Sequence, residues 1–543
     1  MKTRISILFL FITHSLMLLS GTMRVNRFHP YSDIDNTIIA SVEITPKDLK
    51  ENELNVYMDN QVLILHLRYI EDRGEGDFGV IFQNDSMLLS ASVYHHQLSG
   101  ILQGTNYVYS ISKDSIGNIF MYDIDVASIP EDSSPIVSSD SNTLDERQTY
   151  SLQDTVVRVA FFYTADINTS FKQNLITHVS NAILHSNVSF INSNIHAKLQ
   201  LVYIGETQYI SDNFDDDLER FRDKNDNYMD EIHQIREMYY ADICVLLTAS
   251  SEYCGLGYLK STKNNAFCAV CANSGCFSKY SFTHEIGHNI GCHHDAYVQN
   301  NTIPTYAHGY IHLDGNNSWR TIMAYDNLCS DNSCTCGRIL YWSNPEICYN
   351  GIATGNNKAN NARVWNERVG TVSDFYGIPA TYFMTNSLFD RADYAHIIGS
   401  DYVYTIAPCH IPNGVTVTIN AEEKIVLRSG FHAKAGSKLH IKIDQPITTL
   451  STSAAVTQHV APPSFSAPVR NIASTDGVVT SNDNMNISSE MIQSTSIYTI
   501  SGQLLQTFEG DQNDISNLPN GMYILQYRMN DGGVRSEKIA ITK

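Results

Sequence analysis

The chain has 543 residues, which is more than a single hydrophobic core normally supports, so we expect several domains. It carries 57 acidic and 36 basic side chains, for a formal net charge of −21. Since no window holds a dense cluster of Lys and Arg, the composition argues against nucleic acid and anionic membrane surfaces as partners.

Residues 1–22 have the pattern of a signal peptide. Lys2 and Arg4 precede an apolar run that ends in small residues. A membrane anchor is the weaker alternative, because the run is short for a bilayer span and polar residues interrupt it. No later segment is long and apolar enough to cross a bilayer, so we expect a mature chain without a transmembrane span.

The next segments predict a β-rich domain and a linker. Residues 23–125 alternate apolar and polar positions in short runs that turn residues separate. Residues 126–150 are rich in Ser, Asp, Glu and Pro and hold few large apolar side chains, which is typical of a linker.

Residues 151–378 change to an alternation of strands and helices. Apolar runs at 156–163, 199–204 and 243–247 predict buried strands, and amphipathic segments between them predict helices. This order predicts an α/β domain with a mostly parallel, twisted sheet and long helices.

The C-terminal third returns to β-type patterns. Residues 390–443 alternate strictly and predict a small all-β module. Residues 444–490 are rich in Ser, Thr and Pro and predict a second linker, and residues 491–543 predict a final β-sandwich.

All eleven cysteines lie between Cys244 and Cys409, which stands apart from the other ten. In an exported chain this density predicts disulfides within one domain, and ten cysteines permit complete pairing. The alternative is a second metal site at Cys268, Cys271 and Cys276, although their CxxC spacing lacks a matching second pair.

Residues 284–295 read HEIGHNIGCHHD and carry the most specific functional pattern of the sequence. His284 and His288 are four apart, so on a helix both imidazoles face the same side and can hold one ion. Gly291 follows where the helix must end, because glycine adopts a positive φ without steric cost, and the turn brings in His294. Three protein ligands with one open position are typical of a catalytic Zn²⁺ site.

Glu285 lies beside the two helical histidines and has a different predicted role. Its carboxylate is placed to take a proton from a zinc-activated water that attacks a peptide carbonyl, and to pass it to the leaving amine. His293 cannot point the same way as His294 in an extended segment, so we expect it at the surface.

This motif resembles the HExxHxxGxxHD motif of the metzincin metallopeptidases, and Asp295 is typical of their reprolysin-like (adamalysin/ADAM-related) branch. The resemblance covers about residues 155–376 and implies Met323, in TIMAY, as the apolar floor of the metal site. Tyr325 stands where astacin-like and serralysin-like metzincins place a tyrosine, and is a candidate for stabilising the tetrahedral intermediate. The resemblance also implies that the strand near residues 255–259 pairs with extended substrate.

The resemblance places residues 23–125 where a reprolysin prodomain stands. No cysteine precedes Cys244, so a cysteine switch is excluded and latency must come from steric cover or another ligand. Cleavage in the linker, for instance after Arg147, would then activate the chain; a permanent accessory domain is the alternative. The family also allows Ca²⁺, but no acidic loop here matches a calcium pattern.

Residues 491–543 resemble the C-terminal sorting domain of the bacterial type IX secretion system, because SIYTISG, LPNGMYI and KIA occur there in that order. The resemblance implies export by that machinery, with the chain secreted or attached to the cell surface. A generic carbohydrate-binding or adhesion sandwich is the alternative. The module at 390–443 resembles the repeated-strand spacer of such exported proteins.

Together these features predict a secreted zinc-dependent endopeptidase that acts on protein or peptide substrates. One alternative is a catalytically inactive surface adhesion protein that retains a metal site, and another is a metal-dependent hydrolase of a non-peptide amide. The intact Glu285 favours the enzyme over the adhesion protein. No residue pattern predicts the cleavage preference.

Overall fold

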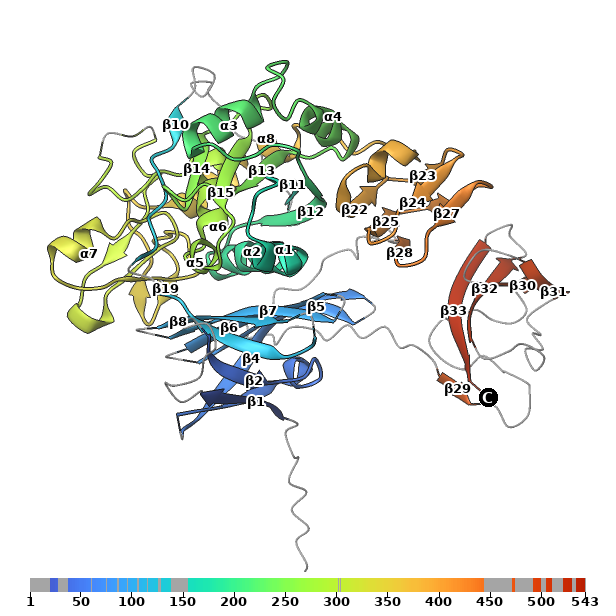
Figure 1. Cartoon of the computed structure of the whole chain (residues 1–543), viewed down its shortest axis with the longest axis horizontal. Helices are drawn as coiled ribbons and strands as arrows, with labels where there is room; N and C mark the ends of the chain where they lie inside the picture. Colours follow the sequence, from blue (N-terminus) through green and yellow to red (C-terminus); the bar gives the residue numbers. More distant parts are fainter. Residues whose placement is uncertain are drawn as a thin grey trace, which may run out of the picture. The chain divides into compact units, whose positions relative to one another are not determined.

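The structure, a computed structural model, describes residues 20–27, 38–137 and 155–443 and five strands between residues 471 and 542. Within these ranges it leaves out residues 60, 75, 85–86, 95, 105–106, 115, 126–127, 301 and 303. The chain divides into two compact units, Met1–Ile447 and Thr448–Lys543, which are described separately (Figure 1). Arg147, nearly all of the signal segment and most of the second linker lie outside the described residues.

A closed barrel forms the N-terminal part of the first unit. Its strands are β1 (Ser20–Arg27), β2 (Ile38–Glu43), β3 (Glu53–Met58), β4 (Gln61–Gly74), β5 (Asp77–Gln83), β6 (Met87–Tyr94), β7 (Gln97–Gly104), β8 (Val108–Lys113) and β9 (Ile119–Asp123). The parallel pair of β1 and β3 closes a barrel whose other neighbours are antiparallel. Buried side chains such as Met23, Leu54 and Phe82 form its core, which confirms the β-rich prediction.

β1 begins within the segment predicted as a signal peptide. Ser20 pairs with Glu53, and the Thr22 amide donates a 2.9 Å hydrogen bond to the Asp48 carboxylate. Cleavage after residue 22 would therefore remove paired residues from the first strand of the barrel.

A nine-stranded sheet organises the rest of the first unit. Its first strands are β10 (Ile136–Val137), β11 (Thr155–Tyr163), β12 (Ala197–Glu206), β13 (Ile243–Thr248), β14 (Gly255–Leu259) and β15 (Phe267–Cys271). β12, β11, β13 and β15 are parallel neighbours, and β14 is antiparallel to β15. β10 pairs in parallel with the outer edge of β14, although it belongs to the segment predicted as a linker.

Helices cover both faces of this sheet, as the strand–helix alternation predicts (Figure 1). They are α1 (Thr169–Gln173), α2 (Leu175–Asn192), α3 (Phe214–Arg222), α4 (Glu231–Met238), α5 (Ser274–Ser278), α6 (Ser281–Ile290), α7 (Asn327–Asp331) and α8 (Asn361–Ser373). Phe161 packs in the core under α2, α6 and α8, whereas its neighbour Phe162 packs in the core under α3 and α4. This alternation follows from the period of two in a strand.

Short strands follow α6 and form two small sheets. They are β16 (Ile311–His312), β17 (Trp319–Arg320), β18 (Gly337–Arg338), β19 (Cys348–Tyr349) and β20 (Ile352–Ala353).

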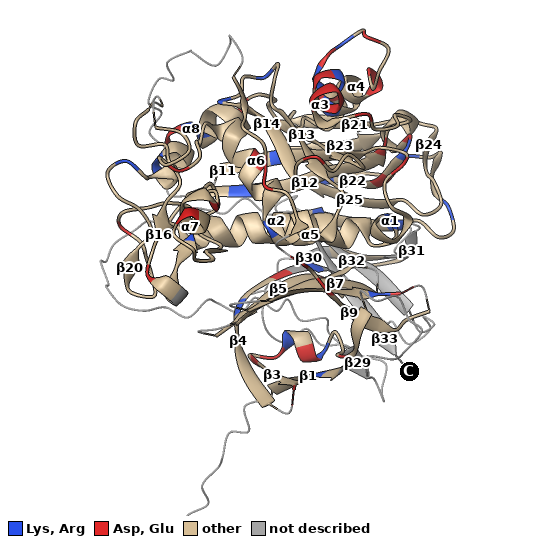
Figure 2. Ribbon diagram, turned by 60° about the vertical axis from the view of Figure 1, so that its left-hand side comes forward, with Lys and Arg blue, Asp and Glu red and all other residues tan. Residues whose placement is uncertain are grey.

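α2 packs against β6 and β7 of the barrel (Figure 2). His185 Nε2 lies 2.6 Å from Ser90 Oγ, and Asn181 donates to the same oxygen at 3.3 Å. The Tyr280 hydroxyl donates to Gln103 of the barrel at 2.6 Å. Polar contacts thus join the barrel to the helix that lies beside α6.

The module predicted at 390–443 is built from parallel ladders. The first strand of these ladders, β21 (Thr381–Met384), lies before the predicted start and pairs with β23. The strands within the predicted bounds are β22 (Ala392–Ile398), β23 (Tyr402–Thr405), β24 (Cys409–Ile411), β25 (Thr416–Ala421), β26 (Lys424–Val426), β27 (Phe431–Ala433) and β28 (Lys438–Ile443). Tyr394 pairs with Thr416 and Thr416 with Lys438, so successive coils lie 22 residues apart. β22 also pairs with β12, so β22, β25 and β28 continue the nine-stranded sheet and do not form the separate module that the sequence predicts.

The second unit holds one described sheet of five strands. They are β29 (Asn471–Ala473), β30 (Ile492–Thr499), β31 (Leu504–Glu509), β32 (Gly521–Met529) and β33 (Val534–Thr542). β29 comes from the predicted second linker and pairs in parallel with β33.

Of the helices that the structure describes, none has the length and apolarity needed to cross a membrane.

Candidate active site

Helix α6 presents the first two histidines, and a glycine turn presents the third. His284 and His288 are fully buried one turn apart on α6. Gly291 ends the helix with φ +118°, a conformation that glycine adopts without steric cost, and the Cys292 amide donates back to the carbonyl of Gly287. The chain then reverses and brings His294 to the other two.

The three imidazoles converge on one point. Their Nε2 atoms lie 3.1 Å apart for His284 and His294, 3.1 Å for His288 and His284, and 3.0 Å for His288 and His294. The backbone carbonyls of Ile322 and Cys292 accept from Nδ1 of His284 and His288, which leaves each Nε2 with a free lone pair.

This arrangement fits a tetrahedral metal ion. Zn–N bonds of about 2.0–2.1 Å require ligand atoms roughly 3.3 Å apart, close to the distances found here. Burial lowers the pKa of all three imidazoles below 6.5, to about 3 for His288, so the rings stay neutral. The three imidazoles can therefore hold one metal ion between them.

Glu285 lies on the same helix and points toward the edge strand β14. Its carboxylate is fully buried, and neither oxygen has a hydrogen-bond partner within the described part of the chain. Burial raises its pKa well above 4.5, and the charge of Asp132 adds to this effect. A Cβ on Gly255 would lie 2.5 Å from Oε1, and one on Gly257 would lie 2.9 Å from Oε2. Only glycine lets β14 approach this carboxylate so closely.

The segment predicted as the methionine turn lies beneath α6. Met323 is fully buried, and its sulfur would lie 2.7 Å from a Cβ on Gly287. Asp295 accepts from the Tyr325 amide at 2.9 Å and so ties this segment to the turn that carries His294. The Tyr325 ring centroid lies 3.9 Å from that of His294.

The expectation for His293 is wrong. It is 7% exposed, because its backbone pairs with residues 307–309 and its ring lies 6.3 Å from that of His308. Because side chains alternate in direction along an extended segment, His293 points away from the other three histidines, but it is buried and does not lie at the surface.

A stretch of the predicted linker runs through the site, which the sequence did not reveal. The Ser133 amide donates to the Gly255 carbonyl at 2.8 Å, and the Cys254 amide donates to the Glu131 carbonyl at 3.2 Å. Asp132 Oδ2 lies 3.7 Å from Nδ1 of His284, and its Oδ1 has no hydrogen-bond partner among the described residues. Residues 129–137 therefore pair with β14 and present a carboxylate to the histidine cluster.

Tyr325 contacts this segment directly. Its hydroxyl donates a short hydrogen bond to the backbone carbonyl of Asp132. Burial and the nearby charges of Asp132 and Glu285 raise its pKa, so the hydroxyl stays protonated and donates. The candidate stabilising residue thus already holds a peptide carbonyl beside the histidines.

Three buried cations surround Glu131, which precedes Asp132. Lys279, Arg320 and Arg338 lie 3.1, 3.0 and 3.2 Å from its carboxylate. Burial alone would raise the pKa of Glu131, but the three cations together hold it well below 4.5. No local sequence pattern predicts this cluster, because its members come from separate elements. The only feature in the sequence that could have pointed to it is the acidic pair Glu131 and Asp132 in a linker that contains proline.

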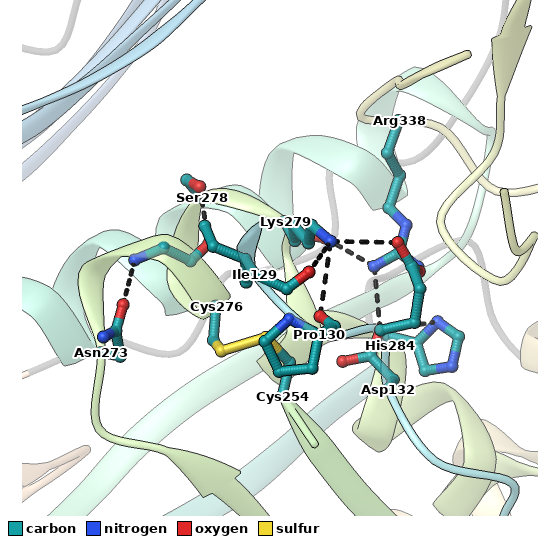
Figure 3. Close-up of a disulfide and its surroundings, with 12 residues drawn as sticks. Ile129, Pro130, Asp132, Cys254, Asn273, Cys276, Ser278, Lys279, His284 and Arg338 are labelled. Carbon is teal, nitrogen blue, oxygen red and sulfur yellow. Dashed lines mark hydrogen bonds and ion pairs between the residues drawn. A yellow bond between two sulfur atoms is a disulfide. The ribbon is translucent and has the colours of Figure 1, made fainter. Parts of the chain in front are cut away.

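The cysteines are paired less completely than the sequence permits. Disulfides join Cys254 to Cys276, between β14 and α5 (Figure 3), and Cys329 to Cys336. Seven cysteines are unpaired, since several lie on buried strands that face different partners; they are Cys244, Cys268, Cys271, Cys292, Cys334, Cys348 and Cys409. Because Cys276 is in a disulfide, the alternative metal site that uses it is not formed.

Comparison with known proteins supports the geometric description. Residues 153–335 match metallo-peptidase family M12, and residues 480–542 match the secretion system C-terminal sorting domain. The second match confirms the predicted sorting domain and indicates export to the cell surface or the extracellular space.

Curated relatives match the catalytic part. A peptidyl-Asp metalloendopeptidase of Xanthomonas campestris pv. campestris is 42% identical over 215 residues, which cover 38% of this chain and 49% of the relative. A protein of the same name from Pseudomonas fragi is 35% identical over 166 residues, 30% of this chain and 85% of that relative. The chain thus spans about half the length of the Xanthomonas relative.

Among solved structures, metalloproteinase-II from Bacteroides fragilis covers 45% of this chain and 81% of its own length, with a TM-score of 0.32 and 14% identity. That likeness is too low to carry an argument. The family match and the Pseudomonas relative are sufficient: the chain belongs to the reprolysin-like metallopeptidases of family M12.

Proposed function

We propose that this chain is an exported zinc-dependent endopeptidase with a metzincin-type catalytic domain. The observation that carries the proposal is the convergence of three neutral imidazoles with their Nε2 atoms 3.0–3.1 Å apart, beside the carboxylate of Glu285, which has no hydrogen-bond partner in the described part of the chain. His284, His288 and His294 would hold the ion. Zn²⁺ fits this nitrogen set, and when bound it supplies a Lewis acid that polarises a peptide carbonyl and acidifies water.

The chain's own residues divide the remaining work. Glu285 takes a proton from the attacking water and returns it to the leaving amine, because its carboxylate has no competing partner among the described residues. The Tyr325 hydroxyl donates to the carbonyl oxygen, as it does to that of Asp132, and would stabilise the negative charge that develops there. Met323 and Asp295 hold the floor and the turn in place.

The edge strand β14 positions the substrate. Its outer edge already pairs with an extended segment, in which the amide of Ser133 donates to the carbonyl of Gly255. A substrate peptide would use the same backbone groups once that segment leaves. The name of the relatives, peptidyl-Asp metalloendopeptidase, points to protein or peptide substrates that contain aspartate.

Residues 129–137 provide the steric cover that latency requires in the absence of a cysteine switch. They occupy the edge of β14 where a substrate would pair, and the carboxylate of Asp132 lies beside His284, 3.7 Å from its Nδ1. Removal of this segment would activate the enzyme. The sorting domain would bring the chain to the type IX secretion machinery.

The test compares the chain with a Glu285→Ala variant on denatured protein, after an added protease that cleaves the linker has activated both and has then been inhibited, each with and without a chelator. We expect cleavage that the chelator abolishes and that falls about 10²–10⁴-fold in the variant. Equal cleavage by the variant would rule out the proposed role of Glu285, and chelator-resistant cleavage would rule out the metal. Cleavage of small amides but of no peptide would identify the non-peptide hydrolase instead.

A further inference from the structure

The three cations around Glu131 come from elements that are far apart in the sequence. Lys279 follows α5, Arg320 ends β17 and Arg338 ends β18, and they are 8%, 4% and 5% exposed. Buried cations are costly unless they are paired, so three at one place indicate a site built for negative charge. The carboxylates that lie within 3.2 Å of them belong to Glu131 and Asp132.

The two guanidinium groups are fixed independently of this segment. Arg320 donates to the carbonyls of Cys336 at 3.2 Å and Ala324 at 2.6 Å. Arg338 donates to the carbonyl of Lys279 at 2.7 Å. Because backbone acceptors hold both groups, they stay in place when the carboxylates leave. Asp326, 3.8 Å from Arg320, offsets only part of the charge.

The ammonium group of Lys279 differs from the guanidinium groups. It donates to the carbonyls of Ile129 and Pro130, at 2.7 and 3.3 Å, and to Glu131 at 3.1 Å (Figure 3). All of these acceptors lie in the segment that covers the cleft. Removal of the segment would therefore leave this cation without its present partners, ready for another peptide.

The cation cluster lies directly beside the reacting centre. Arg338 contacts Asp132 at 3.0 Å, and Asp132 lies 3.7 Å from Nδ1 of His284. The carbonyl that Tyr325 holds belongs to Asp132, one residue after Glu131. A side chain in the cluster is thus adjacent to the peptide group at the metal centre.

We propose that Lys279, Arg320 and Arg338 form the specificity pocket of the enzyme, which selects an acidic side chain next to the cleaved bond, and that Glu131 occupies it in the intact chain. This inference rests on the proposed endopeptidase function and names the residues that determine its substrate class. A neutral side chain in the pocket would leave Lys279 without a carboxylate, and Arg320 and Arg338 with only backbone carbonyls and part of the charge of Asp326, so discrimination against it should be strong.

Lys279→Gln is the sharpest variant, because the bonds of this ammonium go to the covering segment and not to the framework. The matched control is Lys172→Gln, which removes an ion pair with Glu206 outside the cleft. Three peptides that differ at one position, Asp, Asn or Ala, are compared as substrates of the chain in the form that cleaves denatured protein.

We expect the unmodified chain to favour the Asp peptide over the Asn peptide by at least about a hundredfold in kcat/KM. Lys279→Gln should lower this ratio about tenfold or more, Lys279→Arg should restore most of it, and Lys172→Gln should leave it unchanged. If the unmodified chain cleaves all three peptides at equal rates, the proposed specificity pocket is wrong, although the proposed endopeptidase function still holds. Cleavage of denatured protein but of none of the three peptides would also overturn the pocket, whereas failure to cleave denatured protein as well would overturn the proposed function.

A second measurement does not use activity. In the intact chain the amides of Ser133 and Cys254 bond across β14 and the segment, so their hydrogen exchange reports how firmly the segment is held. Glu131→Gln and Lys279→Gln should each accelerate this exchange, and the double variant should add little to either. If the effects of the two substitutions are additive, Lys279 does not bind the side chain of Glu131.

Discussion

Two clusters of buried polar side chains meet at the cleft, and they are completed in different ways. The three histidines are neutral and present lone pairs to one another, so only a cation completes them. The cluster of Lys279, Arg320 and Arg338 is positive and is completed by carboxylates of the chain itself. In the proposed function the first partner stays through every reaction cycle, whereas the second leaves before a substrate enters.

Loss of one histidine should break the first cluster entirely. His288→Ala removes a ligand that no neighbouring group can replace, so we expect loss of bound zinc and a fall in kcat/KM of at least about 10³-fold. His196→Ala, at an exposed position, is the matched control. Zinc content measured by elemental analysis, together with peptide hydrolysis, checks this. Full zinc binding by His288→Ala would contradict the assignment of the ligands.

Loss of the covering carboxylate should open the second cluster without harm to the first. In Asp132→Ala, Arg338 loses a buried partner at 3.0 Å, a kind of change that costs about 3–5 kcal/mol. We therefore expect the uncleaved chain to gain activity at least about tenfold. The measurement is peptide hydrolysis by chain shown to be intact by mass spectrometry. An unchanged rate would mean that residues 129–137 do not hold the enzyme latent.

A smaller change at β14 should test the position of the Glu285 carboxylate without altering any charge. Gly255→Ala places a Cβ 2.5 Å from Glu285 Oε1, so either the strand or the carboxylate must move. Misplacement of a reacting group by about 1 Å costs roughly a hundredfold in rate, and we expect a loss of that size with zinc retained. Gly337→Ala, with no atom within 4 Å of the new Cβ, should be silent. Equal rates for the two variants would show that catalysis does not require β14 to lie so close to the Glu285 carboxylate.

The two clusters also differ in how far the sequence predicts them. His284, His288, Gly291 and His294 act within a helix and the turn that follows, so spacing along the chain determines which way their side chains point. A helix period and one glycine conformation were enough to predict that geometry. The strand–helix alternation predicts the parallel sheet for the same reason.

The cation cluster depends instead on tertiary pairing. Lys279, Arg320 and Arg338 meet because β17 and β18 pair and the end of α5 lies near them. The linker composition around Glu131 is typical of an unpaired segment, and nothing local to it indicates the edge of β14. Similarly, alternation predicts the strands of 390–443 but not that β22 joins β12. Local chemistry predicts an element, while its partner is a property of the whole fold.

Two histidines elsewhere sharpen the contrast, since they are buried without an ion. His178 and His185 lie on α2, and burial lowers their pKa from 6.5 to about 4 and about 3. The folded state keeps both neutral, whereas the unfolded state binds protons once the pH falls below 6.5. Their contribution to the free energy of unfolding is therefore complete above pH 6.5 and is lost as the pH falls toward 3–4.

Between pH 6.5 and 4.5 each of these histidines should remove about 2.5 kcal/mol of stability. Urea unfolding of the chain and of His185→Gln at several pH values measures the difference, and it cancels the titration of the metal ligands, which both proteins share. We expect the variant to be less stable at pH 7.5, because it loses the 2.6 Å contact with Ser90, but to lose less stability on acidification. If the free energy of unfolding depends on pH in the same way for both proteins, folding does not lower the pKa of His185.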